Sequence, residues 1–232
     1  MKTLHDAHRR AYRLLAAGCL AGMAVGALAQ AQNAAPHPCG ELNNAYGPFD
    51  YRTQRNNLWI VENVHFLPDV ERFNRPTAMN FGDLDYTLRA SPNHHRALIS
   101  LARFGETKAP VLGNARSVDC YFDRAIRFAP NDMVVRMIYA SLLLRTAREP
   151  EALKQVDYVS QSAKDNPYTH YNLGLLYVEM KQYGKALEHA HVAMQLGLPR
   201  TELRDALKKA GKWREPQAAA PGEAASAASP AS

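Results

Sequence analysis

Histidine side chains are the groups in this 232-residue chain that first suggest metal binding. His94 and His95 are adjacent, and His189 and His191 lie two positions apart in a predicted helix. Neither pair has the i, i+4 spacing that places two imidazoles on one helix face as joint zinc ligands. We therefore predict no metal site and no cofactor, and we interpret these histidines as surface or interface residues.

The cysteines are the second candidates for chemistry. Cys19 falls within a predicted export signal, so Cys39 and Cys120 remain in the mature chain. A redox-active pair would have C-x-x-C spacing, which is absent, and two thiolates supply only half of a zinc site. In an oxidising compartment an isolated pair of this kind most often forms a disulfide. We predict a bond between Cys39 and Cys120.

No set of residues has the pattern of a catalytic site. Asp83 and Asp85 could hold a divalent ion, but they open a predicted helix, where acids are favoured by the helix dipole. The sequence has no glycine-rich phosphate loop, nucleophile elbow or metalloprotease helix. We predict a protein that is not an enzyme. The alternative hypothesis is a metal- or thiol-dependent accessory enzyme or factor of the cell envelope that uses His94, His95 or the cysteines.

The segment 1–29 has the pattern of a cleavable export signal. Four basic residues, Lys2, Arg9, Arg10 and Arg13, precede an uncharged run from Leu14 to Ala29. That run is shorter than the ~20 residues that a membrane-spanning helix needs, so we expect no stable span after cleavage. Arg9 and Arg10 leave both the general-secretory and the twin-arginine route open, and lipoprotein anchoring at Cys19 is a minor alternative.

Net charge argues against a nucleic-acid partner. The chain carries +6, of which the signal holds +3, so the mature chain keeps +3. Nucleic-acid binding needs positive charge clustered on one face, and the sequence shows no such stripe. We therefore expect a protein or peptide partner.

A repeat with a period of about 34 residues, which is typical of stacked helix pairs, organises the rest of the chain. When residues 136–159 are aligned with 170–193, small residues meet small ones, as Ala140 meets Gly174 where two helices are expected to touch. A helix pair of this length cannot bury both apolar faces alone, so successive pairs must stack. The pattern predicts an all-α fold, a right-handed α-solenoid of about three helix pairs.

Four regions are expected along the chain. They are a signal peptide at 1–29, a partly helical N-terminal extension at 30–80, the helical array at 81–212, and a disordered Ala/Pro/Ser tail at 213–232. In the extension, Leu58–Phe66 is expected to be helical and Pro68–Phe73 to add a short turn. The half-repeat Asp83–Ala90 is expected to cover one end of the array, and a capping helix at Thr201–Ala210 the other. An insertion between Glu106 and Arg116 lengthens the first turn.

The first helix of each pair, helix A, would line the inner wall of such an array. In the middle and last pairs this wall is mostly apolar and consists of Val134, Met137, Ser141, Leu144, Arg145, Tyr168, Tyr171, Leu175 and Val178. An exposed apolar groove usually marks a binding site for a peptide or a helix. The competing hypothesis is that residues 40–80 fill the groove within the chain, and the sequence favours neither.

Sequence motifs add a resemblance. The segment YNLGLLYVEMKQYGKALEHAHVAMQLGLP at 171–199 looks like a tetratricopeptide repeat (TPR). The motifs NAYGPFDYR at 44–52 and DLDYTLRASPNHH at 83–95 resemble a group of exported TPR proteins of Gram-negative bacteria. The resemblance covers residues 39–213 and implies a TPR fold and periplasmic residence, without an activity. The resulting prediction is a periplasmic TPR adaptor or scaffold that binds another protein through its helix A groove.

Overall fold

The computed structural model describes residues 36–74, 77–107 and 116–216. Within these ranges the chain is helical and has no β-strand. The predicted signal peptide, the tail from residue 217 onward and most of the lengthened turn, 108–115, lie outside the described residues. Contacts divide the chain into two units, residues 1–41 and 42–232. The fold described below belongs to the second unit.

The N-terminal extension contains short helical segments. A 3₁₀-helix, η1, spans Arg55–Leu58, a π-helix, η2, spans Val61–His65, and a short α-helix, α2, spans Pro68–Glu71. The predicted helix at Leu58–Phe66 is therefore helical but not a continuous α-helix. Phe66 N–H bonds to the carbonyl of Val61, five residues back, and both side chains are buried. The wider π turn brings residues five apart toward one face, which lets both side chains reach the core.

A longer helix follows, and then three helix pairs and a final helix. The longer helix, α3, spans Thr77–Ala90 and begins before the predicted half-repeat. The pairs are α4 (His95–Glu106) with α5 (Val118–Phe128), α6 (Met133–Arg145) with α7 (Glu149–Ser162), and α8 (Pro167–Glu179) with α9 (Tyr183–Gln195); the final helix is α10 (Glu202–Lys209). The interval from the start of α6 to the start of α8 equals the interval from the start of α7 to the start of α9.

Local signals set the ends of these helices. The side chain of Asn166 accepts hydrogen bonds from two backbone N–H groups in the first turn of α8, and Pro167 occupies the first helical position. Pro150 lies within the first turn of α7, where its missing N–H has no helical partner to lose. Gly197, with φ of 81°, follows α9 in the left-handed conformation that glycine tolerates best.

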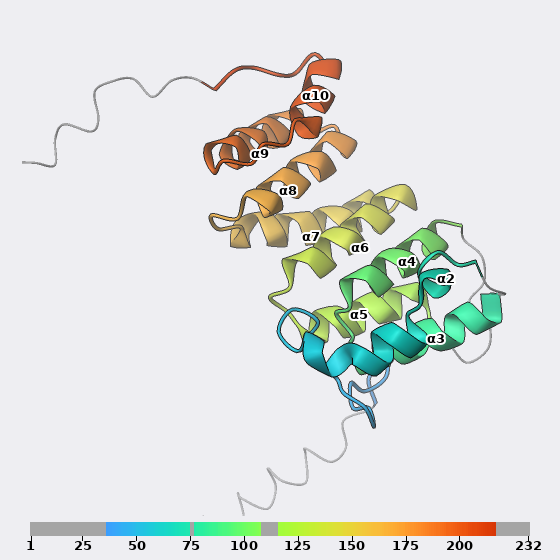
Figure 1. Ribbon diagram of the computed structural model, residues 1–232. Helices are drawn as coiled ribbons and strands as arrows, with labels where there is room; N and C mark the ends of the chain where they lie inside the picture. The colour runs from blue at the N-terminus through green and yellow to red at the C-terminus, as the bar shows by residue number, and fades with distance from the viewer. Residues whose placement is uncertain (1–35, 75–76, 108–115, 217–232) are drawn as a thin grey trace, which may run out of the picture. The chain divides into compact units, whose positions relative to one another are not determined.

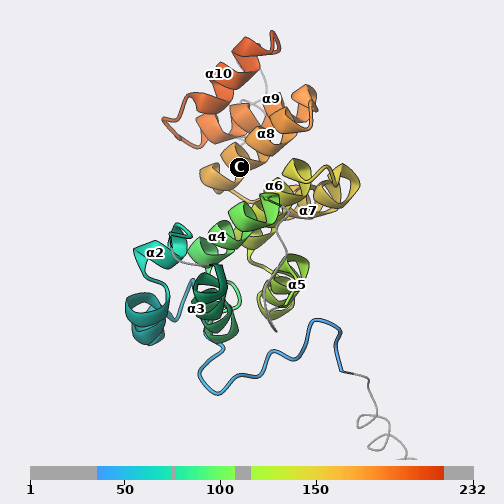
Figure 2. The same ribbon diagram turned by 90° about the vertical axis from the view of Figure 1, so that its right-hand side faces the viewer.

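Helices α4, α6 and α8 contact one another in series, and α10 packs across α8 and α9. Both views show the three helix pairs and then α10 following one another along the second unit (Figures 1 and 2). One buried cluster joins α6 to α10 and another joins α2 to α6. Tyr139 packs against both clusters and so joins them, while a third, smaller cluster around Tyr51, Leu58 and Val61 is separate.

The end of this helical stack is closed by α10. Its apolar residues Leu203 and Leu207 are buried, while Lys208 and Lys209 are exposed, as expected for a polar-backed capping helix. A Cβ atom on Gly174 would lie 2.3 Å from Leu203 Cδ2. The small residue expected at a contact within the last pair therefore accommodates the capping helix instead. Trp213, at the start of the predicted tail, packs against the core and against His191.

Candidate functional site

A groove of about 530 Å³ runs across the first helices of the three pairs. It is lined by Ile99, Ala102, Arg103 and Glu106 of α4, by Val134, Met137, Ile138, Ser141 and Arg145 of α6, and by Asn172, Leu175, Leu176 and Glu179 of α8. None of the described residues between 42 and 80 lines it. The N-terminal extension, as far as it is described in the second unit, therefore leaves the groove open.

Five of the nine residues expected to form the helix A wall line this groove: Val134, Met137, Ser141, Arg145 and Leu175. Leu144 and Val178 are half-buried and pack against the core instead. Tyr168 is 59% exposed but lies outside the groove lining.

Tyr171 is also outside the groove, for a different reason. Its side chain is buried, its hydroxyl donates to Glu202 Oε2 at 3.0 Å, and the guanidinium of Arg200 lies over its ring. These contacts place it under the start of α10. Because α10 packs on α8, it covers part of the α8 face that the repeat pattern had assigned to the groove.

The sequence analysis missed the contribution of α4. Ile99, Ala102 and Arg103 line the groove beside α6, yet the lengthened turn before α5 takes them out of the repeat register that relates α6 to α8. The regular spacing of the later pairs therefore does not predict that these α4 residues line the groove. The shifted alignment of the first pair was the signal that could have found them.

Charged residues collect at one end of the groove. Glu106, Arg145 and Glu179 are the last residues of α4, α6 and α8. Arg145 Nη1 donates to Glu106 Oε1 at 2.7 Å. Glu179 is exposed, but partial desolvation by its neighbours raises its pKa, Arg145 partly offsets this rise, and the charge of Glu106 adds to it. Three helix C-termini add partial negative charge at the same end.

His94 does not have the surroundings of a metal ligand or catalytic base. Its side chain is fully buried, and its ring centroid lies 4.3 Å from that of Tyr51 and 4.9 Å from that of Phe66. Its Nδ1 accepts a hydrogen bond from the N–H of Ala97 and so caps α4. Burial lowers the pKa of His94 to about 3, and the charge of Arg96 acts in the same direction. The imidazole is therefore neutral and acts as the N-cap of α4.

His95 belongs to a buried polar junction between the extension and the helices. Its Nε2 donates to Asp132 Oδ2 at 2.8 Å, and the Asn93 amide donates to the same oxygen at 2.9 Å. Asn93 Oδ1 accepts from the backbone N–H of Tyr51, and Asp132 caps α6. Burial alone would raise the pKa of Asp132, but His95, Asn93 and the charge of Arg52 lower it below its ordinary value.

The polar junction shows that the two motifs quoted above have a structural role. Tyr51 and Arg52 come from NAYGPFDYR, and Asn93 to His95 end DLDYTLRASPNHH. Their hydrogen bonds connect the extension to the starts of α4 and α6. His94 and His95, which the sequence offered as candidates for catalysis or metal binding, therefore stabilise helix starts and the contacts between helices.

A second histidine pair joins α7, α8 and α9. His170 Nδ1 lies 2.8 Å from His189 Nδ1, His170 Nε2 lies 2.9 Å from the carbonyl of Lys164, and Ser160 Oγ lies 3.4 Å from His189 Nε2. One arrangement satisfies every group: Ser160 donates to His189, His189 to His170, and His170 to the carbonyl. Burial and the nearby charges of His170 and Lys185 lower the pKa of His189 to about 4.

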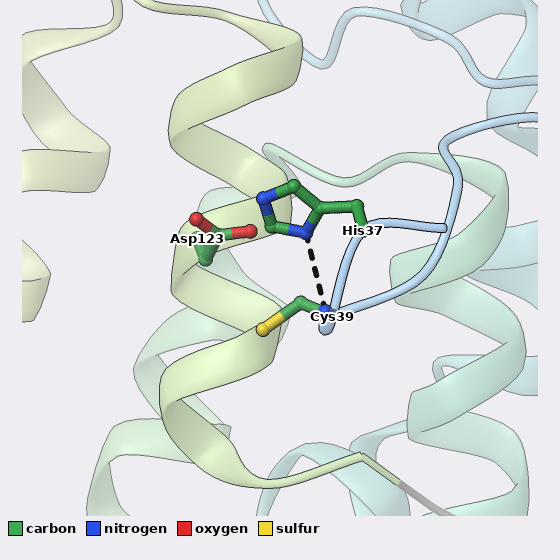
Figure 3. Close-up of side chains that lie close together, drawn as sticks. All are labelled: His37, Cys39 and Asp123. Atoms are coloured by element: carbon green, nitrogen blue, oxygen red, sulfur yellow. Dashed lines mark hydrogen bonds between the residues drawn. The ribbon is translucent and has the colours of Figure 1, made fainter. Parts of the chain in front are cut away.

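The cysteine prediction is confirmed, because Cys39 and Cys120 form a disulfide. In this form neither sulfur is a nucleophilic thiolate. In the first unit, His37 Nδ1 accepts a hydrogen bond from the backbone N–H of Cys39 at 3.2 Å (Figure 3). Asp123, the third residue drawn there, lies on α5 and accepts from Arg127 Nε at 2.8 Å.

Thiol labelling gives a direct test of the bond. Protein without residues 1–29, produced in an oxidising compartment and alkylated under denaturing conditions, is expected to gain no label before reduction and to gain label at both cysteines after it. A Cys120→Ser variant should expose one reactive thiol without reductant. Two labelled thiols in unreduced wild-type protein would contradict the disulfide.

Comparison of the chain with known protein families, curated proteins and solved structures finds no match. No helix in the described ranges is long and apolar enough to span a bilayer. The TPR assignment and the periplasmic location therefore remain predictions from the sequence.

Proposed function

We propose that this protein is a periplasmic TPR scaffold that binds a segment of another protein in the groove of α4, α6 and α8. The three helix pairs would be three TPR units that form a right-handed solenoid, with α10 as its cap. The observation that carries the proposal is the groove itself: the first helices of three successive pairs line it, mostly with apolar side chains, and the described residues between 42 and 80 leave it open.

The size and lining of the groove suit several side chains of a peptide. Its volume of about 530 Å³ lies within the range of cavities that enclose small ligands. Val134 and Ile99 are 40% and 37% exposed and belong to one apolar lining, and it is such grouped apolar surface that usually marks a binding site. The regular spacing of the later helices supports the TPR assignment, and the disulfide supports export to an oxidising compartment.

The metal- or thiol-dependent alternative has weaker support. His94 caps a helix, His95 donates to Asp132, and both cysteines are consumed in a disulfide. We therefore favour binding over catalysis as the role of this protein.

Val134→Glu is expected to weaken partner binding at least about tenfold, because it puts a charge into the apolar lining of the groove. Folding should change little, since Val134 is 40% exposed. Met137 and Tyr171 are poorer choices, because both are buried and their substitution would also test stability. The measurement is photo-crosslinking in intact cells from a benzophenone amino acid placed at Ile99.

Val64→Glu is the matched control. Val64 is 50% exposed on η2 and does not line the groove. The crosslinked product should survive this change and disappear with Val134→Glu. A product that persists in the Val134→Glu protein would rule out the groove as the binding site.

A further inference from the structure

The charged groups of the groove are not all paired. Arg145 and Glu106 form an ion pair, Arg103 lies on α4, and Glu71 of α2, which the charge of Arg103 also reaches, is already paired with Arg96. Glu179 makes no hydrogen bond or ion pair with the described residues. Arg145, the cation that acts on it, is already engaged by Glu106. The α8 side of the groove therefore has an excess negative charge.

Glu179 is exposed to solvent, yet its position in the groove disfavours its charge to some degree. Partial desolvation raises the pKa of its carboxyl, Arg145 opposes this rise, and the second carboxylate, Glu106, adds to it. The C-terminal ends of α4, α6 and α8 add negative potential at this position. A cation brought in by a ligand would compensate all of these effects together.

Helix α8 also presents groups that suit a peptide backbone and apolar side chains. Asn172, Leu175, Leu176 and Glu179 are spaced three, four and seven positions apart and so lie on one face of the helix. The exposed amide of Asn172 can both donate to and accept from a peptide bond. This face thus offers, in order, an amide, an apolar surface and a carboxylate.

We propose that the occupant of the groove is a peptide segment whose apolar side chains are followed by a lysine or arginine, and that this cation pairs with Glu179. The inference rests on the proposed function and adds the chemistry of the partner. The leucines of α8 and the apolar residues of α4 and α6 take the apolar side chains. Glu179 selects for the basic residue.

The test uses a peptide array and the whole mature protein. The array holds nine-residue peptides of Leu, Val, Met and Ala in which Lys, Glu or norleucine is scanned through every position. Wild-type protein is expected to prefer lysine over norleucine at one position by about five- to tenfold and to disfavour glutamate there. Binding of the selected peptides is then measured by fluorescence anisotropy.

Three variants make the result specific. Glu179→Gln should remove the preference for lysine, and Glu179→Lys should reverse it toward glutamate. Glu188→Lys, the same change at an exposed position of α9 outside the groove, should leave the preference intact.

The outcomes separate this inference from the proposed function. Peptides that bind the wild type, lose affinity with Val134→Glu, but show no lysine preference would overturn the role of Glu179 and leave the groove as a peptide site. The role of Glu179 would also be overturned if the Glu179→Lys protein selected the same peptides as the wild type. If no peptide binds in a manner that depends on Val134, both proposals fall.

Discussion

Replacing Asp132 with alanine is expected to lower the free energy of unfolding by about 3–5 kcal/mol, measured by urea denaturation. The carboxylate is almost completely buried, caps α6, and accepts hydrogen bonds from Asn93 and His95. Its loss leaves the Asn93 amide without one of its acceptors in a fully buried site. It also removes the anion that faces Arg52 Nε at 3.5 Å.

Asn166→Ala provides the control for the capping part of this effect. Asn166 caps α8 through the same two kinds of backbone contact, but its side chain is exposed and belongs to no buried network. The Asn166→Ala substitution should lower the free energy of unfolding by about 1 kcal/mol. Asp132→Asn should fall between the two, because asparagine can still cap the helix but lacks the charge. Equal losses for Asp132→Ala and Asn166→Ala would show that the buried junction contributes nothing beyond the cap.

The helices of the middle and last pairs could be predicted closely, because their signals are local. Asn166 and Pro167 mark the start of α8, and Gly197 follows the end of α9, in agreement with the general preferences of these residue types at helix ends. Apolar periodicity then identified which residues face other helices. These features depend on neighbours within a few residues, so one sequence is enough to find them.

The groove was predicted in part, because periodicity identifies a helix face but not what later covers it. Val134 and Leu175 line the groove as expected, whereas Tyr171 is buried under the start of α10. Tyr171 and Glu202 are 31 residues apart, and no local pattern records that contact. The sequence predicted a capping helix at Thr201–Ala210, whose buried side is formed by Leu203 and Leu207, but not which residues of α8 that side would cover.

The buried polar junction could not be derived from the sequence at all. Asn93 bonds to Tyr51 and to Asp132 across 42 and 39 residues. In the sequence only His95 of this junction was a candidate for chemistry, because a histidine can serve a metal site or catalysis as well as a structural hydrogen bond. Only their geometry shows that their hydrogen bonds are directed at one another and at helix starts.

Acidification from pH 7 to pH 5 is expected to lower the free energy of unfolding by about 2 kcal/mol through His94 alone. The unfolded residue titrates near 6.5, whereas burial lowers its folded pKa to about 3. Between these values the unfolded chain binds more protons, so stability is complete above pH 6.5 and falls as the pH drops. His189, with a folded pKa of about 4, adds a loss in the same direction.

The pH dependence of stability in a His94→Asn variant isolates this effect. Asparagine can cap α4 but does not titrate, so urea denaturation at pH 7, 6 and 5 should show a slope reduced by about 1 kcal/mol per pH unit. The variant should be less stable at pH 7, since the smaller side chain leaves space between Tyr51 and Phe66. Only the change in slope reports the protonation, because contributions from Glu179, Asp50 and other groups cancel between the two proteins. A slope equal to that of the wild type would mean that His94 takes up a proton without unfolding, which would contradict its enclosure between the two rings.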